Sequence, residues 1–117
     1  MEELSIPIFK KSYDFYKEFY GYLKTFPRSD RYSLGQKCEQ YILEIIECII
    51  LASQVSKSEK LPILEKASSK LNILRILIRL AKEIKALDNK KYLTSEKHLD
   101  EIGRMLGGWI KSTKTSS

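Results

Sequence analysis

The sequence predicts an all-α fold in which four helices pack as an up-down antiparallel bundle. Hydrophobic residues make up 43% of the 117 residues, yet the alternation of apolar and polar residues that is typical of strands is nearly absent. Glycine and proline, at five and three residues, are scarce. Apolar residues recur instead at helical spacing, and the connections between the periodic segments are short, which favours antiparallel neighbours. The length favours one domain over residues 1–117.

The first helix is expected over residues 8–25. Its apolar residues recur every three or four positions, on one face at Phe9, Tyr13, Tyr16, Tyr20 and Leu23 and on an adjoining face at Phe15, Phe19 and Tyr22. We expect this aromatic stripe to be core rather than a platform for stacking bases. Pro27 ends the helix, because the residue before a proline disfavours the α region. Ser29 or Asp30 can then cap the next helix.

The second helix is expected over residues 30–55 and the third over 59–87, with Pro62 in the first turn of the third. Both are more apolar than one buried face requires. Within residues 41–52 the only polar side chains lie about 60° apart around the helix, at Glu44 and Glu47. Residues 71–80 show the same pattern, with polar side chains only at Asn72, Arg75 and Arg79. A polar strip this narrow indicates that other helices cover each of these two helices on most sides. This predicts a homo-oligomer, and the alternative is a tightly filled monomer core.

The fourth helix is expected over residues 89–112, with Asp88 or Asn89 as its cap. One face carries the side chains of Tyr92, Leu99, Ile102, Leu106 and Trp109. The remaining residues, 113–117, contain no apolar side chain, and we expect them to be frayed.

Three of the five glycines lie in this last helix, although each costs about 1 kcal/mol relative to alanine in a helix interior. Gly103 and Gly107 are one turn apart, which favours close approach of another backbone, and Gly108 leaves room beside Trp109. Alternatively, Gly107 and Gly108 simply end the helix. The spacing does not decide between these interpretations.

Positive charge is concentrated on and around the third helix. Residues 57–91 contain ten basic and four acidic side chains, an excess equal to the net charge of +6 of the whole chain. Arg75, Arg79 and Lys82 form a row at positions i, i+4 and i+7, with no acid within the row. This row is either a solvated face that keeps an apolar helix in solution or a ridge that binds phosphates.

The sequence offers little support for catalysis. His98 is the only histidine, and no ligand spacing typical of zinc joins it to the two cysteines. Pairing of a cysteine with His98 would require a coincidence of folding, and no phosphate-binding glycine motif is present. We therefore expect no enzyme, no cofactor and no metal. Glu96, Asp100 and Glu101 are expected to be a solvated face.

Cys38 and Cys48 lie about 15 Å apart if they share one helix, which is too far for a disulfide. We expect them to be buried thiols in a reducing cytoplasm. The longest apolar run is five residues and a transmembrane helix needs about 20, so no membrane partner is expected. The acidic N-terminus is unlike a signal peptide.

Three segments carry a family resemblance: residues 26–36 (FPRSDRYSLGQ), 80–84 (LAKEI) and 99–112 (LDEIGRMLGGWIKS). They resemble the accessory variability determinant (Avd) proteins of diversity-generating retroelements. A neighbouring branch, encoded in intervening sequences of bacterial 23S ribosomal RNA genes, usually has a SIPANIAEG-like run in the second helix. This chain has LEIIECII at residues 43–50 instead, which favours the Avd branch.

The resemblance implies a homopentameric barrel with a basic surface that binds the reverse transcriptase and nucleic acid, RNA or DNA, and supports mutagenic cDNA synthesis without catalysing it. The candidate nucleic-acid or polymerase-binding residues are Arg75, Arg79, Lys82, Lys85, Arg28 and Arg31. The candidate packing and interface residues are Gly103, Gly107, Gly108, Trp109, Ile45 and Ile49. One alternative is an oligomeric scaffold of the ribosomal intervening-sequence type with no polymerase partner. Another is a helical RNase dependent on His98.

Overall fold

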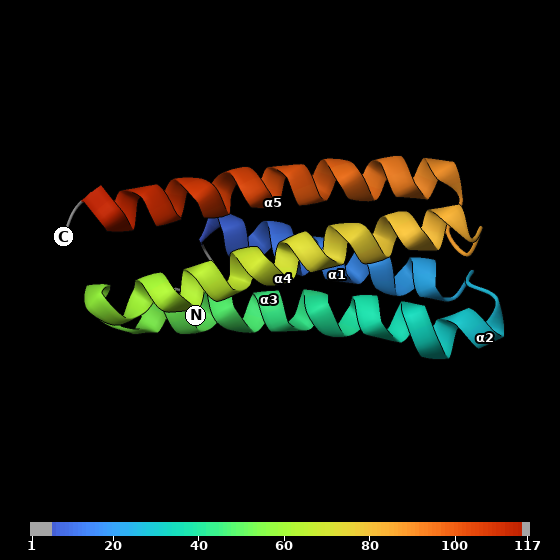
Figure 1. Ribbon diagram of the computed structural model, residues 1–117, viewed down its shortest axis with the longest axis horizontal. Coiled ribbons are helices and arrows are strands. Elements are labelled where there is room, and N and C mark those ends of the chain that lie inside the picture. Colours follow the sequence, from blue (N-terminus) through green and yellow to red (C-terminus); the bar gives the residue numbers. More distant parts are fainter. Residues whose placement is uncertain (1–5, 116–117) are drawn as a thin grey trace.

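The computed structural model describes residues 6–115 and shows the predicted all-α architecture, with four long helices packed side by side (Figure 1). These helices are α1 (Pro7–Leu23), α3 (Gln36–Gln54), α4 (Lys57–Glu83) and α5 (Asn89–Thr115). Successive long helices run in opposite directions, and the bundle measures 47 × 26 × 21 Å. Each packs mainly against two others, so that α1 lies diagonally opposite α4 and α3 lies opposite α5.

The chain enters α3 through a short helix, α2 (Arg28–Asp30), and a π-helical turn, η2 (Arg31–Gly35). The helical run therefore begins two residues earlier than expected, and neither Ser29 nor Asp30 caps it. Pro27 occupies the cap position in an extended conformation, and its carbonyl accepts the backbone N–H groups of the third and fourth residues that follow. The predicted side-chain cap is therefore wrong, because a proline can begin a helix with its carbonyl oxygen alone.

Gly35 is buried where η2 approaches the end of α1. A Cβ atom at this position would lie 2.7 Å from Leu23 Cδ2 and 3.2 Å from both the Asp30 carbonyl oxygen and Phe26 Cδ2. Distances this short leave no space for a methyl group, so the turn that carries Arg31 depends on a glycine.

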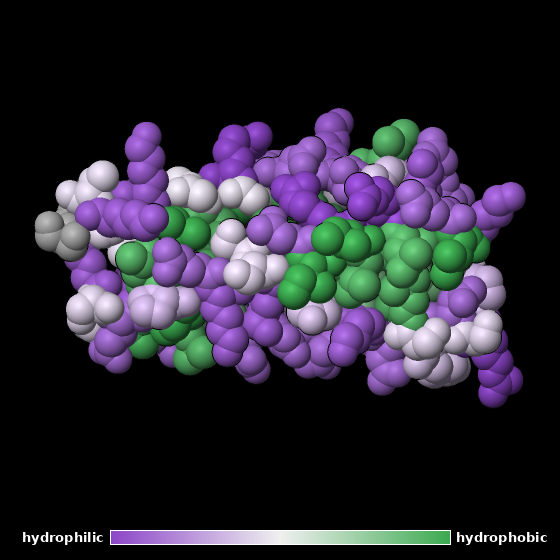
Figure 2. Space-filling view, in the orientation of Figure 1, coloured by the Kyte–Doolittle hydropathy of each residue, from purple (hydrophilic) through white to green (hydrophobic). Residues whose placement is uncertain are grey.

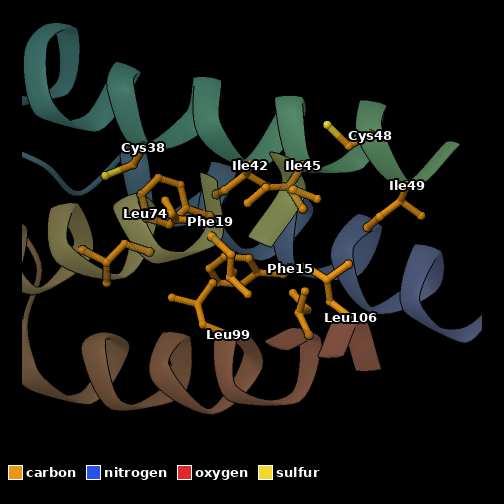
Figure 3. Packing of buried hydrophobic residues seen from close by; sticks show 14 of the residues in the cluster. Phe15, Phe19, Cys38, Ile42, Ile45, Cys48, Ile49, Leu74, Leu99 and Leu106 are labelled. Atoms are coloured by element: carbon orange, nitrogen blue, oxygen red, sulfur yellow. The ribbon is translucent and has the colours of Figure 1, made fainter. Parts of the chain in front are cut away.

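The core is one continuous cluster formed by one stripe of each long helix (Figure 3). Phe15 and Phe19 of α1 are 1% and 0% exposed, whereas Tyr13 and Tyr20 are 49% and 51% exposed. The expectation that all these aromatic rings lie in the core was therefore wrong for Tyr13 and Tyr20, whereas Tyr16 and Tyr22 are partly buried against it. The fully apolar side chains of both faces are buried, including Phe9 and Leu23, and the tyrosines lie nearer the surface because a tyrosine hydroxyl needs a polar partner or water.

Helix α4 begins at Lys57, so Pro62 lies inside the helix rather than in its first turn. The Ser56 carbonyl accepts the backbone N–H groups of Glu59 and Lys60, and the Ser56 hydroxyl lies 2.8 Å from a Glu59 carboxylate oxygen. These bonds start the helix two residues before the expected position.

Helix α4 ends in a Schellman turn. The N–H of Ala86 donates to the Ala81 carbonyl and the N–H of Lys85 donates to the Lys82 carbonyl, at 2.9 and 3.0 Å. Lys85 has a φ of 66°, in the left-handed region that glycine usually occupies at this position. The N–H of Lys91 then donates to Asp88 Oδ1 at 2.8 Å, so Asp88 caps α5 as expected.

Helix α5 continues to Thr115, three residues beyond its expected end. Thr113 is buried and its hydroxyl donates to the Trp109 carbonyl at 2.9 Å, so residues 113–115 are helical where fraying was expected. The rest of that tail, 116–117, lies outside the described residues. Gly107 and Gly108 are in the helix interior, which rules out the interpretation that they end it.

Apolar side chains remain on the outer surface of the bundle. Ile73, Ile76, Leu80 and Ile84, on and just after α4, are between 42% and 57% exposed. Figure 2 shows a hydrophobic patch over the C-terminal half of α4. The protomer by itself therefore does not cover this helix on most sides. No helix within residues 6–115 is long and apolar enough to cross a membrane.

Replacement of Lys85 by glycine should stabilise the fold by about 0.5–1 kcal/mol, because glycine adopts the left-handed conformation without the steric cost that other residues carry. The free energy of unfolding from urea titration measures this. Lys85→Ala, which removes the same charge but keeps the strain, is the matched control and should give no such gain. Equal gains in both variants would contradict the assignment.

Replacement of Gly35 by alanine should lower the free energy of unfolding by about 1–2 kcal/mol, because overpacking outweighs the gain in helix propensity. Gly21→Ala is the matched control, since Gly21 is also helical but a Cβ there meets no atom within 4 Å. That variant should be stabilised by up to about 1 kcal/mol. Chemical denaturation of both proteins tests the difference, and shifts of the same sign would refute it.

Candidate nucleic-acid interface

Arg75, the first residue of the basic row, is bound to α5. Its Nη1 lies 2.7 Å from Asp100 Oδ1, and its Nη2 donates to the Leu99 carbonyl at 3.0 Å. A Cβ at Gly103 would lie only 2.9 Å from Arg75 Nη2, so this glycine leaves space for the guanidinium group. The row itself contains no acid, as the sequence indicates, but Asp100 of another helix neutralises Arg75. Gly103 admits a side chain rather than a neighbouring backbone.

Arg79 and Lys82 are the cations of the row that remain available. Arg79 is exposed and forms no ion pair with any residue in the described range 6–115. It lines a shallow hollow of about 190 Å³ together with Ile76, Tyr92 and Glu96. The Lys82 ammonium lies 5.1 Å from the centre of the Tyr92 ring, a distance typical of a cation–π contact.

The other three candidate residues lie outside α4. Lys85 is exposed in the turn that follows this helix, and Arg28 is exposed at the start of α2. Arg31 lies in η2, where its Nη2 donates to the Lys24 carbonyl at 3.0 Å. The Nε of Arg31 is shielded from solvent and has no hydrogen-bond partner among the described residues.

The structure brings these two groups of residues to one end of the bundle. The corner between α1 and α2 and the turn between α4 and α5 both lie at this end (Figure 1), and Lys91 Nζ donates to Thr25 Oγ1 across them at 3.2 Å. We call this region the basic end, and its cations are Lys24, Arg28, Arg31, Lys82, Lys85, Lys90 and Lys91. Its acids are Asp30, Glu83 and Asp88. Such an excess of cations attracts phosphates.

Sequence reasoning missed the exposed tyrosines of α1. Lys17 Nζ lies 5.0 Å from the centre of the Tyr13 ring, and Lys24 Nζ lies 5.3 Å from that of Tyr20. The available signal was a lysine four residues after each of these two tyrosines, a spacing that places the ring and the ammonium on the same face of a helix.

The predicted packing residues divide into core and surface. Ile45 and Ile49 are 2% and 0% exposed and lie in the core of the protomer, so a second copy cannot contact them. A Cβ at Gly107 or Gly108 would meet no atom within 4 Å, so neither glycine permits a close approach within the chain. Trp109 is half-buried, with Lys60 Nζ 5.6 Å from the centre of its ring.

The cysteines and the histidine are engaged in packing or pairing. Burial raises the pKa of the Cys38 thiol to about 12, and burial also raises the pKa of Cys48, so neither thiol is ionised near neutral pH. His98 Nε2 lies 2.8 Å from Glu18 Oε2. Within residues 6–115, no three or more His, Cys, Asp or Glu side chains are placed to hold a metal ion.

Comparison with known proteins gives one family. No curated protein matches the chain. A family model described as bAvd-like matches residues 6–113, which include all of the long helices except the last two residues of α5. The chain therefore belongs to the bAvd-like family, the bacterial accessory variability determinants, which are non-catalytic accessory proteins of diversity-generating retroelements.

Proposed function

We propose that this protein is a homopentameric accessory subunit that binds the reverse transcriptase of its retroelement and nucleic acid, and so supports mutagenic cDNA synthesis. The observation that carries the proposal is the basic end, where cations distant in sequence gather on a protein of this family. The proposed contacts are Lys82 and Lys85 from one side of this end, together with Arg79 just before them on α4, and Arg28 and Arg31 from the other side.

Arg79 is the strongest single candidate for a phosphate contact. Its guanidinium group can donate two parallel hydrogen bonds to one phosphate, and it forms no ion pair within residues 6–115, although Glu96 lines the same hollow. Arg75 differs, because moving to a phosphate would break its ion pair with Asp100 and its bond to the Leu99 carbonyl. Arg75 therefore contributes mainly by holding α4 against α5.

Substitution of Arg79 and Lys82 by glutamine should weaken nucleic-acid binding without affecting the fold. The binding constant falls with salt, and each lost phosphate contact reduces the magnitude of the slope of log binding constant against log salt concentration by about 0.7–0.9. Loss of both contacts should therefore reduce it by about 1.5. Fluorescence anisotropy with labelled RNA and DNA at several salt concentrations measures this. Lys60→Gln with Lys66→Gln, at the other end of the same helix, removes the same charge and should leave the slope near its original value. Equal slopes for the wild type and the Arg79/Lys82 variant would exclude these contacts.

The polymerase partner is tested by co-purification with a reverse transcriptase of a diversity-generating retroelement from the same genome. The proposal expects a stable complex that the Arg79→Gln, Lys82→Gln variant weakens. If the protein forms an oligomer but no polymerase binds, the alternative of a scaffold without a polymerase partner is favoured.

The proposed assembly is supported by the outward apolar stripe Ile73, Ile76, Leu80 and Ile84. These side chains follow one face of α4 at intervals of three and four residues, where a monomer in water would gain by burying them. A ring of five requires a heterologous contact in which this stripe meets a different surface of the next protomer.

Substitution of Ile76 and Leu80 by lysine should dissociate the oligomer, because the contact would then bury two unpaired charges in place of apolar side chains. Size-exclusion chromatography with light scattering should give five times the 13.6 kDa chain mass for the wild type and one chain mass for the variant. Leu51→Lys, a similarly exposed position on α3, is the control and should remain oligomeric. A monomeric wild-type protein at micromolar concentration would refute the assembly.

A further inference from the structure

An alternating row of tyrosines and lysines runs along the exposed side of α1. Tyr13, Lys17, Tyr20 and Lys24 occupy positions i, i+4, i+7 and i+11, so they share one face of the helix. All four are exposed, and each lysine ammonium lies within 5.3 Å of the centre of the tyrosine ring that precedes it. We call this row the tyrosine–lysine stripe. It places an aromatic surface and a cation side by side twice along the helix.

The stripe leads into a hollow at the basic end. This hollow has a volume of about 390 Å³ and is lined by Tyr20, Leu23, Lys24, Arg31, Tyr32, Gln36 and Glu39. Tyr32 is 65% exposed, so the hollow has an accessible aromatic ring on both the α1 side and the η2 side. Arg31 contributes the shielded Nε that lacks a partner among the described residues. A planar ligand that carries an acceptor would fit this combination of aromatic rings and donors.

We propose that the tyrosine–lysine stripe and this hollow bind unpaired bases of a single-stranded nucleic acid. Bases stack on the rings of Tyr20 and Tyr32, while Lys17, Lys24 and Arg31 contact the phosphates beside them. The proposal rests on the proposed function for the class of ligand, but it assigns a separate surface and a different chemistry, namely stacking in addition to charge.

A single strand fits this surface better than a duplex does, because the faces of paired bases are covered by their neighbours in the stack. Stacking is tolerant of sequence, since every base has an aromatic face. The nearby acids have partners within the protein, which reduces their repulsion of phosphates. Asp14 lies 3.0 Å from Lys10 Nζ and 3.7 Å from Nζ of Lys17 in the stripe, and Glu39 accepts a hydrogen bond from the Tyr16 hydroxyl at 2.7 Å.

The position of α1 keeps this surface away from the apolar stripe of α4. The two helices lie diagonally opposite in the bundle, so their outward faces point to opposite sides. A strand on α1 therefore does not compete for the apolar stripe Ile73, Ile76, Leu80 and Ile84.

The test compares three labelled ligands by fluorescence anisotropy: a 20-nucleotide single strand, the same strand with abasic residues, and a duplex of equal length. The full-length wild-type protein should bind the base-bearing strand more tightly than the abasic strand. Tyr20→Leu with Tyr32→Leu should weaken binding of the base-bearing strand about 10–100-fold, the range expected from losing one to two stacked bases. Duplex and abasic binding should change less than threefold.

Tyr20→Phe with Tyr32→Phe is the matched control, since it keeps both rings and should retain wild-type affinity. Circular dichroism should show that both double variants keep the helical fold, because both side chains are exposed. If the leucine variant binds all three ligands like the wild type, the inference is overturned and the proposed function stands. If the leucine variant loses only the reverse transcriptase, the surface contacts a protein, which also overturns the inference. If the wild type binds none of the ligands, both the inference and the proposed nucleic-acid binding fail.

Discussion

A four-helix bundle can bury only one stripe of each helix, and this constraint shapes the whole molecule. The stripes that are buried meet around Phe15 and Phe19 of α1, which are almost fully enclosed by the other three long helices. Any apolar side chain outside a stripe is left on the surface, as Ile76 of α4 is at 57% exposure. Since exposed apolar stripes are costly in water, the same geometry that completes the core creates a surface that favours association.

The contact between α4 and α5 uses only one arginine of the row formed by Arg75, Arg79 and Lys82. Arg75 reaches the Leu99 carbonyl and Asp100, and Gly103 leaves the space that its guanidinium group needs. The helix-propensity cost of this glycine is thereby offset by an ion pair and a hydrogen bond between two helices. Arg79, one turn later, lacks such a partner within residues 6–115, which is why it is the proposed phosphate contact. Two arginines with the same charge, one turn apart, therefore have different surroundings, since Arg75 is paired within the fold and Arg79 is not.

The sequence alone predicted the number, type and approximate bounds of the long helices, because apolar periodicity is a property of each segment. It could not predict which aromatic rings of α1 are buried, since that depends on the helices packed against it. It also missed the ion pair of Arg75, whose partner lies on another helix, and the basic end, where two corners distant in sequence meet. Local signals found Asp88 as a cap but not Pro27, because proline caps without a side-chain hydrogen bond.

The two different ends of the protomer decide where an assembly would bind its ligands. The two ends of the protomer differ: one carries the basic end and the tyrosine hollow, and the other carries Trp109 with the exposed glycines Gly107 and Gly108. In any ring with cyclic symmetry, equivalent atoms lie at the same height along the axis. The basic ends of all protomers in the proposed pentamer would therefore form a single ring of positive charge. Contacts that are individually weak then act together, because a strand held by one protomer is presented to the next at high effective concentration. The proposed assembly would thus convert a modest local excess of cations into a surface that can retain a long nucleic acid.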